Sequence, residues 1–480
     1  NVNERTLYMN ILYAASEAIP YAASGGLADV AGSLPAALCA AGHDCRVVLP
    51  LYKSIKQELR DELEFIANFT VNVSWRMQYC GLFIGNINGV KYYLLDNEYY
   101  FGRNGLYGFY DDCERFAFLS RAIMEMIKYI GWTPNVINAN DWQTALVPIY
   151  YNIFYKYQYG YDNIKTVFTI HNIQYQGKYG LEVINEVLGI PMYHTRLIEY
   201  DGCVNLMKGA FETADKITTV SPSYAWEILD TWYSHGLDRA LNSKQYKLCG
   251  FLNGIDVTTF DPAKDPLLTK NFTIKNLKGK AECKSALLNE LNLQEGNEPI
   301  IGIITRFVSH KGIDLIKYVF DDMVKMGYKF VILGSGEKIY EDFFKEMAYR
   351  YPDRVSTTIG FIPDFARRVY SSCDMFLMPS QSEPCGLAQM ISLRYGTIPI
   401  VRETGGLRDS IRDAGGENGN GFTFKTYNAY DMLDAVRRAK EFYDDPKAWK
   451  NLVIAAMKCD YSWASSAELY IGLYKELVGG

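Results

Sequence analysis

Two basic residues in the second half of the chain stand where they could bind an anionic substrate. Arg306 and Lys311 follow the apolar run 299–304, and Gly312 then opens a helix-like pattern. Fixed positive charges beside a helix N-terminus at the carboxyl end of a strand form a diphosphate site in physical terms. The alternative is a pair of solvated charges on a loop, which is the usual environment of lysine and arginine.

Glu383 is the carboxylate that could serve such a site. It follows the apolar run 375–378 and a turn, and it precedes Pro384. Proline is favoured in the first turn of a helix, where its missing N–H group costs nothing. The pattern predicts that Glu383 caps a helix that continues through Tyr395 and that it faces a ligand. A cap carboxylate that only satisfies backbone N–H groups is the alternative.

Polar residues also end two apolar runs in the first half of the chain. Asp141 and Trp142 follow the run 136–138, and His171 ends the run 166–170. Ligands of parallel α/β sheets bind at the carboxyl ends of the strands. These side chains are therefore candidates for a second group of ligand contacts, with a hydrogen-bonded structural histidine as the other reading of His171.

Gly25 and Gly26 lie between the first apolar run, 10–15, and the first helix-like segment. Without side chains, such a turn lets backbone N–H groups and a helix N-terminus approach an anionic or hydroxyl-rich ligand. A tight turn required by the sheet alone explains the same pattern, so the two glycines are only candidates for ligand binding.

The elements that would position these residues are short strands alternating with helices. Helix-like segments separate the apolar runs, and this alternation predicts parallel sheets covered by helices. The pattern weakens over 257–298 and then restarts, which indicates two doubly wound α/β sheets. The runs fall at 10–15, 46–51, 136–138, 166–170 and 216–220, and then at 299–304, 329–333, 354–359, 375–378 and 398–401.

Length and composition exclude several classes of protein. A chain of 480 residues is too long for one ordinary core, so two domains are expected. A net charge of −6 is against a nucleic-acid partner, and no window approaches a membrane span. Met9 is a candidate natural start, which would make residues 1–8 an addition.

Metal and nucleotide motifs are also absent from the sequence. The ten cysteines form no Cys-x-x-Cys pair and there are only five histidines, so neither a zinc knuckle nor a His-rich metal site is expected. There is no Walker phosphate loop, no Gly-x-Ser-x-Gly elbow and no His-Glu-x-x-His. Reduced thiols in a cytosol-like compartment are the simplest interpretation of the cysteines.

The motifs that contain the candidate residues, taken together and in this order, resemble those of bacterial-type glycogen and starch synthases. The resemblance extends from Met9 to Trp463. It rests on Ser24-Gly-Gly-Leu-Ala-Asp-Val30, Asn138-Ala-Asn-Asp-Trp142, His171-Asn-Ile-Gln-Tyr-Gln-Gly177, Asn253-Gly-Ile-Asp256, Pro379-Ser-Gln-Ser-Glu-Pro-Cys-Gly-Leu387 and Thr404-Gly-Gly-Leu407.

This resemblance implies the GT-B fold, in which two Rossmann-like doubly wound α/β domains face each other across a cleft and a C-terminal helix crosses back to the first domain. The boundaries expected from it are 9–255 with 461–480 for an acceptor-glucan domain, 256–298 for a linker region and 299–460 for a nucleotide-sugar donor domain.

The same resemblance implies a retaining hexosyltransferase. Such an enzyme moves glucose from ADP-glucose to the non-reducing end of an α-1,4-glucan, namely glycogen, starch or a malto-oligosaccharide. No metal or other cofactor is expected, neither nucleic acid nor membrane is an expected partner, and the expected location is cytoplasmic.

Position by position, the resemblance implies three sets of site residues. Arg306 and Lys311 would hold the donor diphosphate, and Glu383 would be the key carboxylate. The implied catalytic residues are Glu383, Arg306, Lys311, His171 and Asp141; the donor-binding residues are Gly25, Gly26, Asn253, Phe361, Cys385, Gly386, Leu387, Thr404 and Gly405; the acceptor-binding residues are Glu17 and Trp142.

One position departs from the family pattern. Where the family has lysine before its Gly-Gly turn, this chain has Ala23, followed by Ser24. A missing positive charge could weaken donor binding, since a charge-assisted hydrogen bond is worth roughly 1.5–3 kcal/mol. The alternatives are therefore a synthase that prefers UDP-glucose and a weakly active protein that binds glucans or assists initiation.

Overall fold

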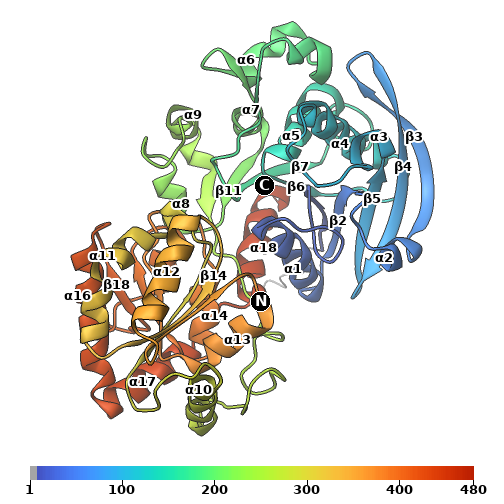
Figure 1. Ribbon diagram of the computed structural model, residues 1–480. Coiled ribbons are helices and arrows are strands. Elements are labelled where there is room, and N and C mark those ends of the chain that lie inside the picture. The colour runs from blue at the N-terminus through green and yellow to red at the C-terminus, as the bar shows by residue number, and fades with distance from the viewer. Residues whose placement is uncertain (1–7, 480) are drawn as a thin grey trace, which may run out of the picture. The chain divides into compact units, whose positions relative to one another are not determined.

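The computed structural model describes residues 8–479 and divides the chain into two compact units (Figure 1). Among these residues, the first unit comprises 8–220, 225–251 and 463–479, and the second comprises 221–224 and 252–462. Residues 1–7, which belong to the segment expected to precede the natural start, lie outside the described part. The segment 256–298, expected as a linker region, is counted within the second unit.

The first unit is built on a nine-stranded sheet in the order β12-β11-β7-β6-β1-β2-β5-β4-β3. All neighbouring pairs are parallel except β3–β4 and β4–β5. β1 is buried on both faces, as expected of a central strand between helices. The strands are β1 (Asn10–Ala14), β2 (Asp44–Pro50), β3 (Glu64–Val73), β4 (Arg76–Ile87), β5 (Val90–Asp96), β6 (Val136–Asn140), β7 (Lys165–Ile170), β11 (Lys216–Thr219) and β12 (Leu248–Gly250).

Helices and a small second sheet complete this unit. The small sheet pairs β8 (Lys178–Tyr179), β10 (Cys203–Asn205) and β9 (Glu199–Tyr200). Short 3₁₀ turns occur at Trp142–Thr144, Met192–His194 and Gln245–Lys247, and π turns at Tyr151–Tyr155 and Ile184–Leu188. The helices are α1 (Gly26–Ala40), α2 (Gln57–Asp61), α3 (Glu98–Phe101), α4 (Asp112–Met126), α5 (Leu146–Tyr150), α6 (Thr195–Ile198), α7 (Leu206–Thr213) and α9 (Asp238–Asn242), while α8 (Pro222–Glu227) spans the boundary.

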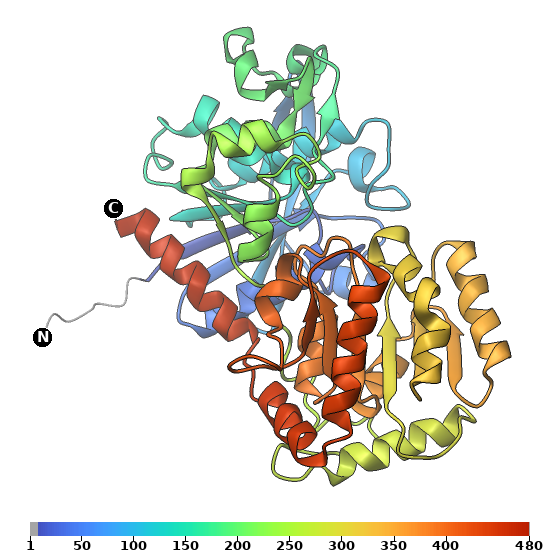
Figure 2. The ribbon, with the colours of Figure 1, turned by 90° about the vertical axis from the view of Figure 1, so that its left-hand side faces the viewer.

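The C-terminal helix α18 (Trp463–Gly479) belongs to the first unit, which confirms the expected return of the chain (Figure 2). It packs against α1. The buried Tyr474 hydroxyl donates to Asn138 Oδ1 at 2.8 Å, and Lys216 pairs with Glu476 at 2.8 Å. Burial of one helix face and a hydrogen bond to a central strand fix this helix to the sheet.

The second unit has a six-stranded parallel sheet in the order β15-β14-β13-β16-β17-β18. Numbered along the unit this is 3-2-1-4-5-6, the Rossmann order, with its switch point between β13 and β16. The strands are β13 (Ile300–Ile304), β14 (Lys329–Gly334), β15 (Val355–Ile359), β16 (Met375–Met378), β17 (Ile398–Arg402) and β18 (Phe422–Phe424).

Apolar helix faces cover this sheet. Leu287 and Leu288 of α10 pack with Val369 of α13 and with β13 and β14 in one buried cluster. A 3₁₀ turn, Ser309–Lys311, separates the first of these helices from the others. The helices are α10 (Lys278–Glu290), α11 (Ile313–Lys325), α12 (Lys338–Arg350), α13 (Pro363–Ser372), α14 (Ala388–Arg394), α15 (Gly405–Ser410), α16 (Ala429–Tyr443) and α17 (Pro446–Met457).

Candidate active site

In the first unit, the candidate residues gather at the carboxyl ends of β1, β6 and β7, and we call this group the first-unit site. Asp141 follows β6 directly, and His171 follows β7 directly. The Oδ1 atom of Asp141 accepts hydrogen bonds from the backbone N–H groups of His171 and Asn172, at 2.7 and 3.4 Å. The structure therefore brings the two predicted residues into contact.

Asp141 is held in an unusual state. Its φ of 55° lies in the left-handed region, which non-glycine residues adopt only where their surroundings enforce it. Burial raises the pKa of its carboxyl to about 7, although the N–H groups of His171 and Asn172 oppose this, and the charge of Glu17 raises it further. A strained, desolvated carboxyl at the end of a parallel strand is typical of a functional position.

His171 is neutral at ordinary pH. Burial lowers the pKa of its imidazole to about 3. Its Nε2 atom lies 2.8 Å from the side-chain Oδ1 of Asn140, the last residue of β6. The ring can therefore take part in neutral hydrogen bonds, but it cannot supply positive charge to a substrate.

Glu17 faces the glycine turn after β1. Its Oε2 atom accepts from the backbone N–H and the hydroxyl of Ser24, at 2.7 and 2.6 Å. Burial raises the pKa of this carboxyl, while the Ser24 donors counteract the rise. Gly25 lies beside it, since a Cβ there would be 3.8 Å from Glu17 Oε1, and Gly26 begins α1. Ala23, the position where the family has lysine, is exposed.

Trp142 is packed rather than free. Its ring meets Phe116 edge-on with centroids 5.2 Å apart and Tyr179 at 6.1 Å. Gly177 is required beside it, because a Cβ there would lie 2.8 Å from the indole and its φ is +68°. Trp142 thus presents a partly exposed ring in a fixed orientation, as an acceptor contact needs.

In the second unit, an ion pair joins the carboxyl ends of β13 and β16, and we call this region the second-unit site. Lys311 Nζ lies 2.7 Å from Glu383 Oε2, and the side chains are 16% and 10% exposed. The Ser380 hydroxyl donates to the same oxygen at 2.9 Å. Two donors on one carboxylate oxygen fix the orientation of Glu383 and leave Oε1 to meet a ligand.

Glu383 does not cap a helix, contrary to the prediction from Pro384. The helix α14 begins at Ala388, with Leu387 as its N-cap residue. The Glu383 carbonyl does not accept a hydrogen bond within a helix. It accepts instead from the backbone N–H of Gly406 in α15, at 3.1 Å.

Glycines explain this conformation of the loop. A Cβ on Gly405 would lie 2.0 Å from the Glu383 carbonyl oxygen, and one on Gly406 would lie 2.0 Å from that of Cys385. Gly386 has a φ of +70°, which also stops a helix from starting earlier. The close approach of two glycines therefore replaces the helical turn that the sequence pattern favoured.

Further contacts pin the loop that carries Glu383. Arg402, at the end of β17, donates from Nε to the Ser380 carbonyl at 2.9 Å and from Nη2 to the Gln381 carbonyl. The Gln381 N–H donates to the His310 carbonyl at 2.8 Å, which ties the loop to the segment that carries Lys311. Nothing in the motif pattern pointed to Arg402, whereas Ser380 lies inside it, three residues before Glu383.

The remaining donor candidates differ in exposure. Arg306 is exposed, and the ring of Phe361, after β15, is 89% exposed and free to stack on a ligand. Thr404 is the N-cap residue of α15 and is fully buried.

Asn253 and Cys385 are neighbours. Burial raises the pKa of the Cys385 thiol to about 12, although the backbone N–H of Asn253 opposes the shift. In the described residues, Asn253 Oδ1 is buried without a hydrogen-bond partner, so it can accept from a ligand.

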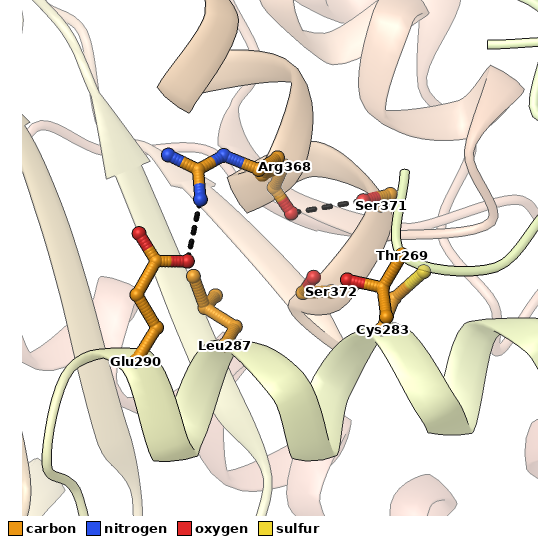
Figure 3. A pocket seen from close by; sticks show the side chains of 7 residues that line it. All are labelled: Thr269, Cys283, Leu287, Glu290, Arg368, Ser371 and Ser372. Carbon is orange, nitrogen blue, oxygen red and sulfur yellow. Dashed lines mark hydrogen bonds and ion pairs between the residues drawn. The ribbon is translucent and has the colours of Figure 1, made fainter. Parts of the chain in front are cut away.

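The cavities found in the second unit lie elsewhere. One, of about 10 Å³, is lined by α10 and α13 residues, among which Arg368 and Glu290 form an ion pair (Figure 3). It is large enough for about one water molecule. Another, of about 280 Å³, is lined by Met390, Arg394 and the segment 457–462 with Ile255 and Val257. Neither contains a predicted site residue.

Metal ligands and membrane-spanning helices can both be assessed from the structure. Within residues 8–479, no group of three or more His, Cys, Asp or Glu side chains is arranged to hold a metal ion. Among the helices described, none is both long and apolar enough to cross a membrane.

The chain matches two family descriptions. Residues 10–243 match the starch synthase catalytic domain, and residues 289–454 match the group 1 glycosyl transferases. The glycogen synthase of Clostridium botulinum is 47% identical over 476 residues, covering 98% of this chain and 99% of that protein. The glycogen synthase of Bacillus anthracis is 46% identical over 475 residues, covering 98% and 100%.

Solved structures agree. The catalytic domain of starch synthase IV from Arabidopsis thaliana, bound to ADP and acarbose, has a TM-score of 0.88 and 34% identity, covering 99% of this chain and 100% of that chain. Sucrose-phosphate synthase from Thermosynechococcus elongatus, at 16% identity and a TM-score of 0.60 over 98% and 99%, shares the fold alone. The predicted GT-B fold and the resemblance are confirmed: the chain belongs to the glycogen and starch synthase family of retaining glucosyltransferases.

Proposed function

We propose that the chain transfers glucose from ADP-glucose to the non-reducing end of an α-1,4-glucan, with retention of configuration and without a metal. The observation that carries this proposal is the buried Lys311–Glu383 pair at the switch point of the second sheet, 2.7 Å between Nζ and Oε2. The substrates in this proposal are inferred from similar proteins. The Arabidopsis starch synthase structure contains ADP, and the bacterial relatives are named glycogen synthase.

The second-unit site would act on the donor. Breaking a glycosyl phosphate bond creates an oxocarbenium-like sugar and a diphosphate anion together, and each is stabilised by fixed opposite charge. Arg306 and Lys311 would face the anion. Glu383, whose Oε2 is engaged by Lys311 and Ser380, would direct Oε1 to the sugar. The rest of the donor would be contacted by Asn253, Phe361, Cys385, Gly386, Leu387, Thr404 and Gly405.

The first-unit site would hold the transferred glucose and the acceptor. His171 and Asp141 would contact glucose hydroxyls, because a neutral imidazole and a carboxyl with a pKa of about 7 are hydrogen-bonding groups. Gly25 and Gly26 would let the α1 N-terminus approach the donor. Glu17 and Trp142 would face the acceptor chain.

Retention without an obvious, well-placed second carboxylate favours a front-face reaction. In this step the bond from glucose C1 to the diphosphate oxygen breaks while the acceptor 4-oxygen bonds to C1 on the same face, and the leaving phosphate takes the proton of the 4-hydroxyl. A double displacement would instead need a carboxylate that forms a covalent glucosyl enzyme. Isolation of a glucosylated side chain after reaction with ADP-glucose would overturn the front-face route.

We further propose a cytoplasmic location. The ten cysteines are all free thiols, and proteins of oxidising compartments usually pair them. The partners in this proposal are ADP-glucose and an α-1,4-glucan.

The test is to incubate the protein with glycogen, excess EDTA and either ADP-glucose or UDP-glucose, and to measure nucleoside diphosphate release together with glucan chain length. Chain elongation with ADP-glucose supports the proposal. Preference for UDP-glucose would show that the proposed donor is wrong. Glycogen binding without turnover of either donor would show that the protein binds glucans without acting as an enzyme.

Matched variants connect the activity to the site. Glu383→Ala should abolish turnover, whereas Glu417→Ala, which removes an exposed glutamate of the same unit, should not change it. Calorimetric melting of both variants shows whether they fold. A Glu383→Ala protein that folds and keeps full activity would refute the assignment of this carboxylate.

A further inference from the structure

The side-chain amide of Asn140 is oriented by two backbone carbonyls. Its Nδ2 donates to the carbonyl oxygens of Ala14 at 2.9 Å and of Asn138 at 3.2 Å. Rotating the amide by 180° would place Oδ1 against these two oxygens, which donate nothing. The Oδ1 atom must therefore face His171, and it lies 2.8 Å from Nε2.

This orientation determines which nitrogen of His171 carries hydrogen. An amide oxygen only accepts, so a hydrogen bond to it requires hydrogen on Nε2. A neutral imidazole holds one such hydrogen, which leaves a lone pair on Nδ1. We infer that Asn140 is a positioning residue that fixes His171 as the Nε2–H tautomer, so that Nδ1 accepts a hydrogen bond from a sugar hydroxyl; the sugar rests on the proposed function.

Asn140 is itself immobile. It is fully buried, its backbone N–H donates to Thr144 Oγ1 at 2.6 Å, and the same hydroxyl donates to the Asn140 carbonyl at 2.8 Å. In the sheet, Asn140 pairs in register with Thr169 of β7, two residues before His171. Both the amide and the ring are therefore held by the same pair of strands.

The surroundings favour the neutral ring. Burial is the cause that lowers the pKa of His171 to about 3. The neighbouring carboxyl of Asp141 accepts from the His171 backbone N–H, and its own pKa is raised to about 7. The pKa of Glu17 is also raised by burial. With no described cation bonded to the ring, His171 acts toward a ligand as an acceptor and not as an acid.

The test uses the full chain labelled with ¹⁵N-histidine. There are five histidines, at 43, 171, 194, 235 and 310, so His171→Gln assigns the signals by subtraction. Two-bond proton–nitrogen spectra distinguish Nε2–H, Nδ1–H and doubly protonated rings. We expect His171 to give the Nε2–H pattern without titration between about pH 5 and pH 8. An Nδ1–H or doubly protonated pattern overturns the inference.

Variants test the part played by Asn140. Asn140→Leu and the smaller Asn140→Ala both remove the acceptor of the Nε2–H group, so each should mix the tautomers. Asn138→Leu is the matched control, since Asn138 is equally buried on the same strand and bonds Thr169 and Tyr474 instead. If Asn140→Leu does not fold, Asn140→Ala decides. An unchanged His171 spectrum in the folded variant refutes a positioning role.

Measurements with and without substrate distinguish a failure of this inference from a failure of the proposed function. Adding ADP-glucose with a malto-oligosaccharide should shift the Nδ1 signal, and Asn140→Ala should lower kcat/KM about tenfold. The tautomer of the free protein stands or falls whether or not glucose is transferred. Turnover with an unperturbed Nδ1 signal would overturn the acceptor role of His171 while leaving the synthase activity intact.

Discussion

Removing one partner of the Lys311–Glu383 ion pair should strongly destabilise the second unit. Nζ and Oε2 are 2.7 Å apart, and the side chains are 16% and 10% exposed. At an effective dielectric constant of about 20, two unit charges at this distance attract by about 6 kcal/mol, which desolvation largely offsets. Lys311→Met removes the attraction but leaves a buried carboxylate, so we expect the free energy of unfolding to fall by about 3–5 kcal/mol.

A second substitution shows whether charge burial is the cause. Adding Glu383→Gln to Lys311→Met removes the remaining charge and keeps an oxygen that can accept from Ser380, so the double variant should recover most of the loss. Lys338→Met is the control, because Lys338 is 87% exposed and pairs with Asp342 only at 3.6 Å. Calorimetry measures all three. A double variant as unstable as the single one, or a single variant as stable as the control, would refute the reasoning.

Three further predictions concern neighbouring residues. Burial raises the pKa of Asp141 to about 7, so its ionisation reduces the free energy of unfolding as the pH rises from about 4 through 7. Denaturation at pH 5 and pH 8 should therefore show that Asp141→Asn is more stable, relative to the native protein, at pH 8 than at pH 5. Ala23→Lys should lower the KM for ADP-glucose by roughly tenfold or more if the missing charge matters, and an unchanged KM contradicts this. Gly405→Ala should abolish activity, because its Cβ would lie 2.0 Å from the Glu383 carbonyl, whereas Gly472→Ala in α18, with no atom within 4 Å, should leave kcat unchanged.

The central strands of the second sheet could be predicted because they are buried on both faces. β13 and β14 read as continuous apolar runs, and their observed bounds differ from the predicted ones by one residue at most. The short strand β18 (Phe422–Phe424) was not predicted.

The antiparallel edge of the first sheet was missed for the opposite reason. β3 alternates exposed and buried residues over 69–73, and β4 alternates exposed residues with half-buried or buried ones over 76–80. Such strands bury one face only, so their sequence contains no continuous apolar run. Their pairing is fixed by the hairpin geometry and by burial against α4, which short windows of sequence do not contain.

The sequence proposes candidate site residues by type, but it does not contain their conformation. Strand ends and resemblance pointed to Glu383, yet its backbone depends on Gly405 and Gly406, about 20 residues later. The contact between Asn140 and His171 likewise joins two strands across 31 positions. Contacts between residues this far apart in the sequence depend on tertiary packing, which local propensity does not describe.

In each unit, the loop after one strand takes its hydrogen-bond partners from the end of the next strand in the sheet. Asp141, after β6, accepts from N–H groups just past β7, and the loop after β16 is held by Arg402 at the end of β17. Neighbouring parallel strands end on the same edge, so their loops can satisfy each other without regular structure. Side chains on such loops are fixed before substrate binds, which is the preorganisation that electrostatic catalysis requires.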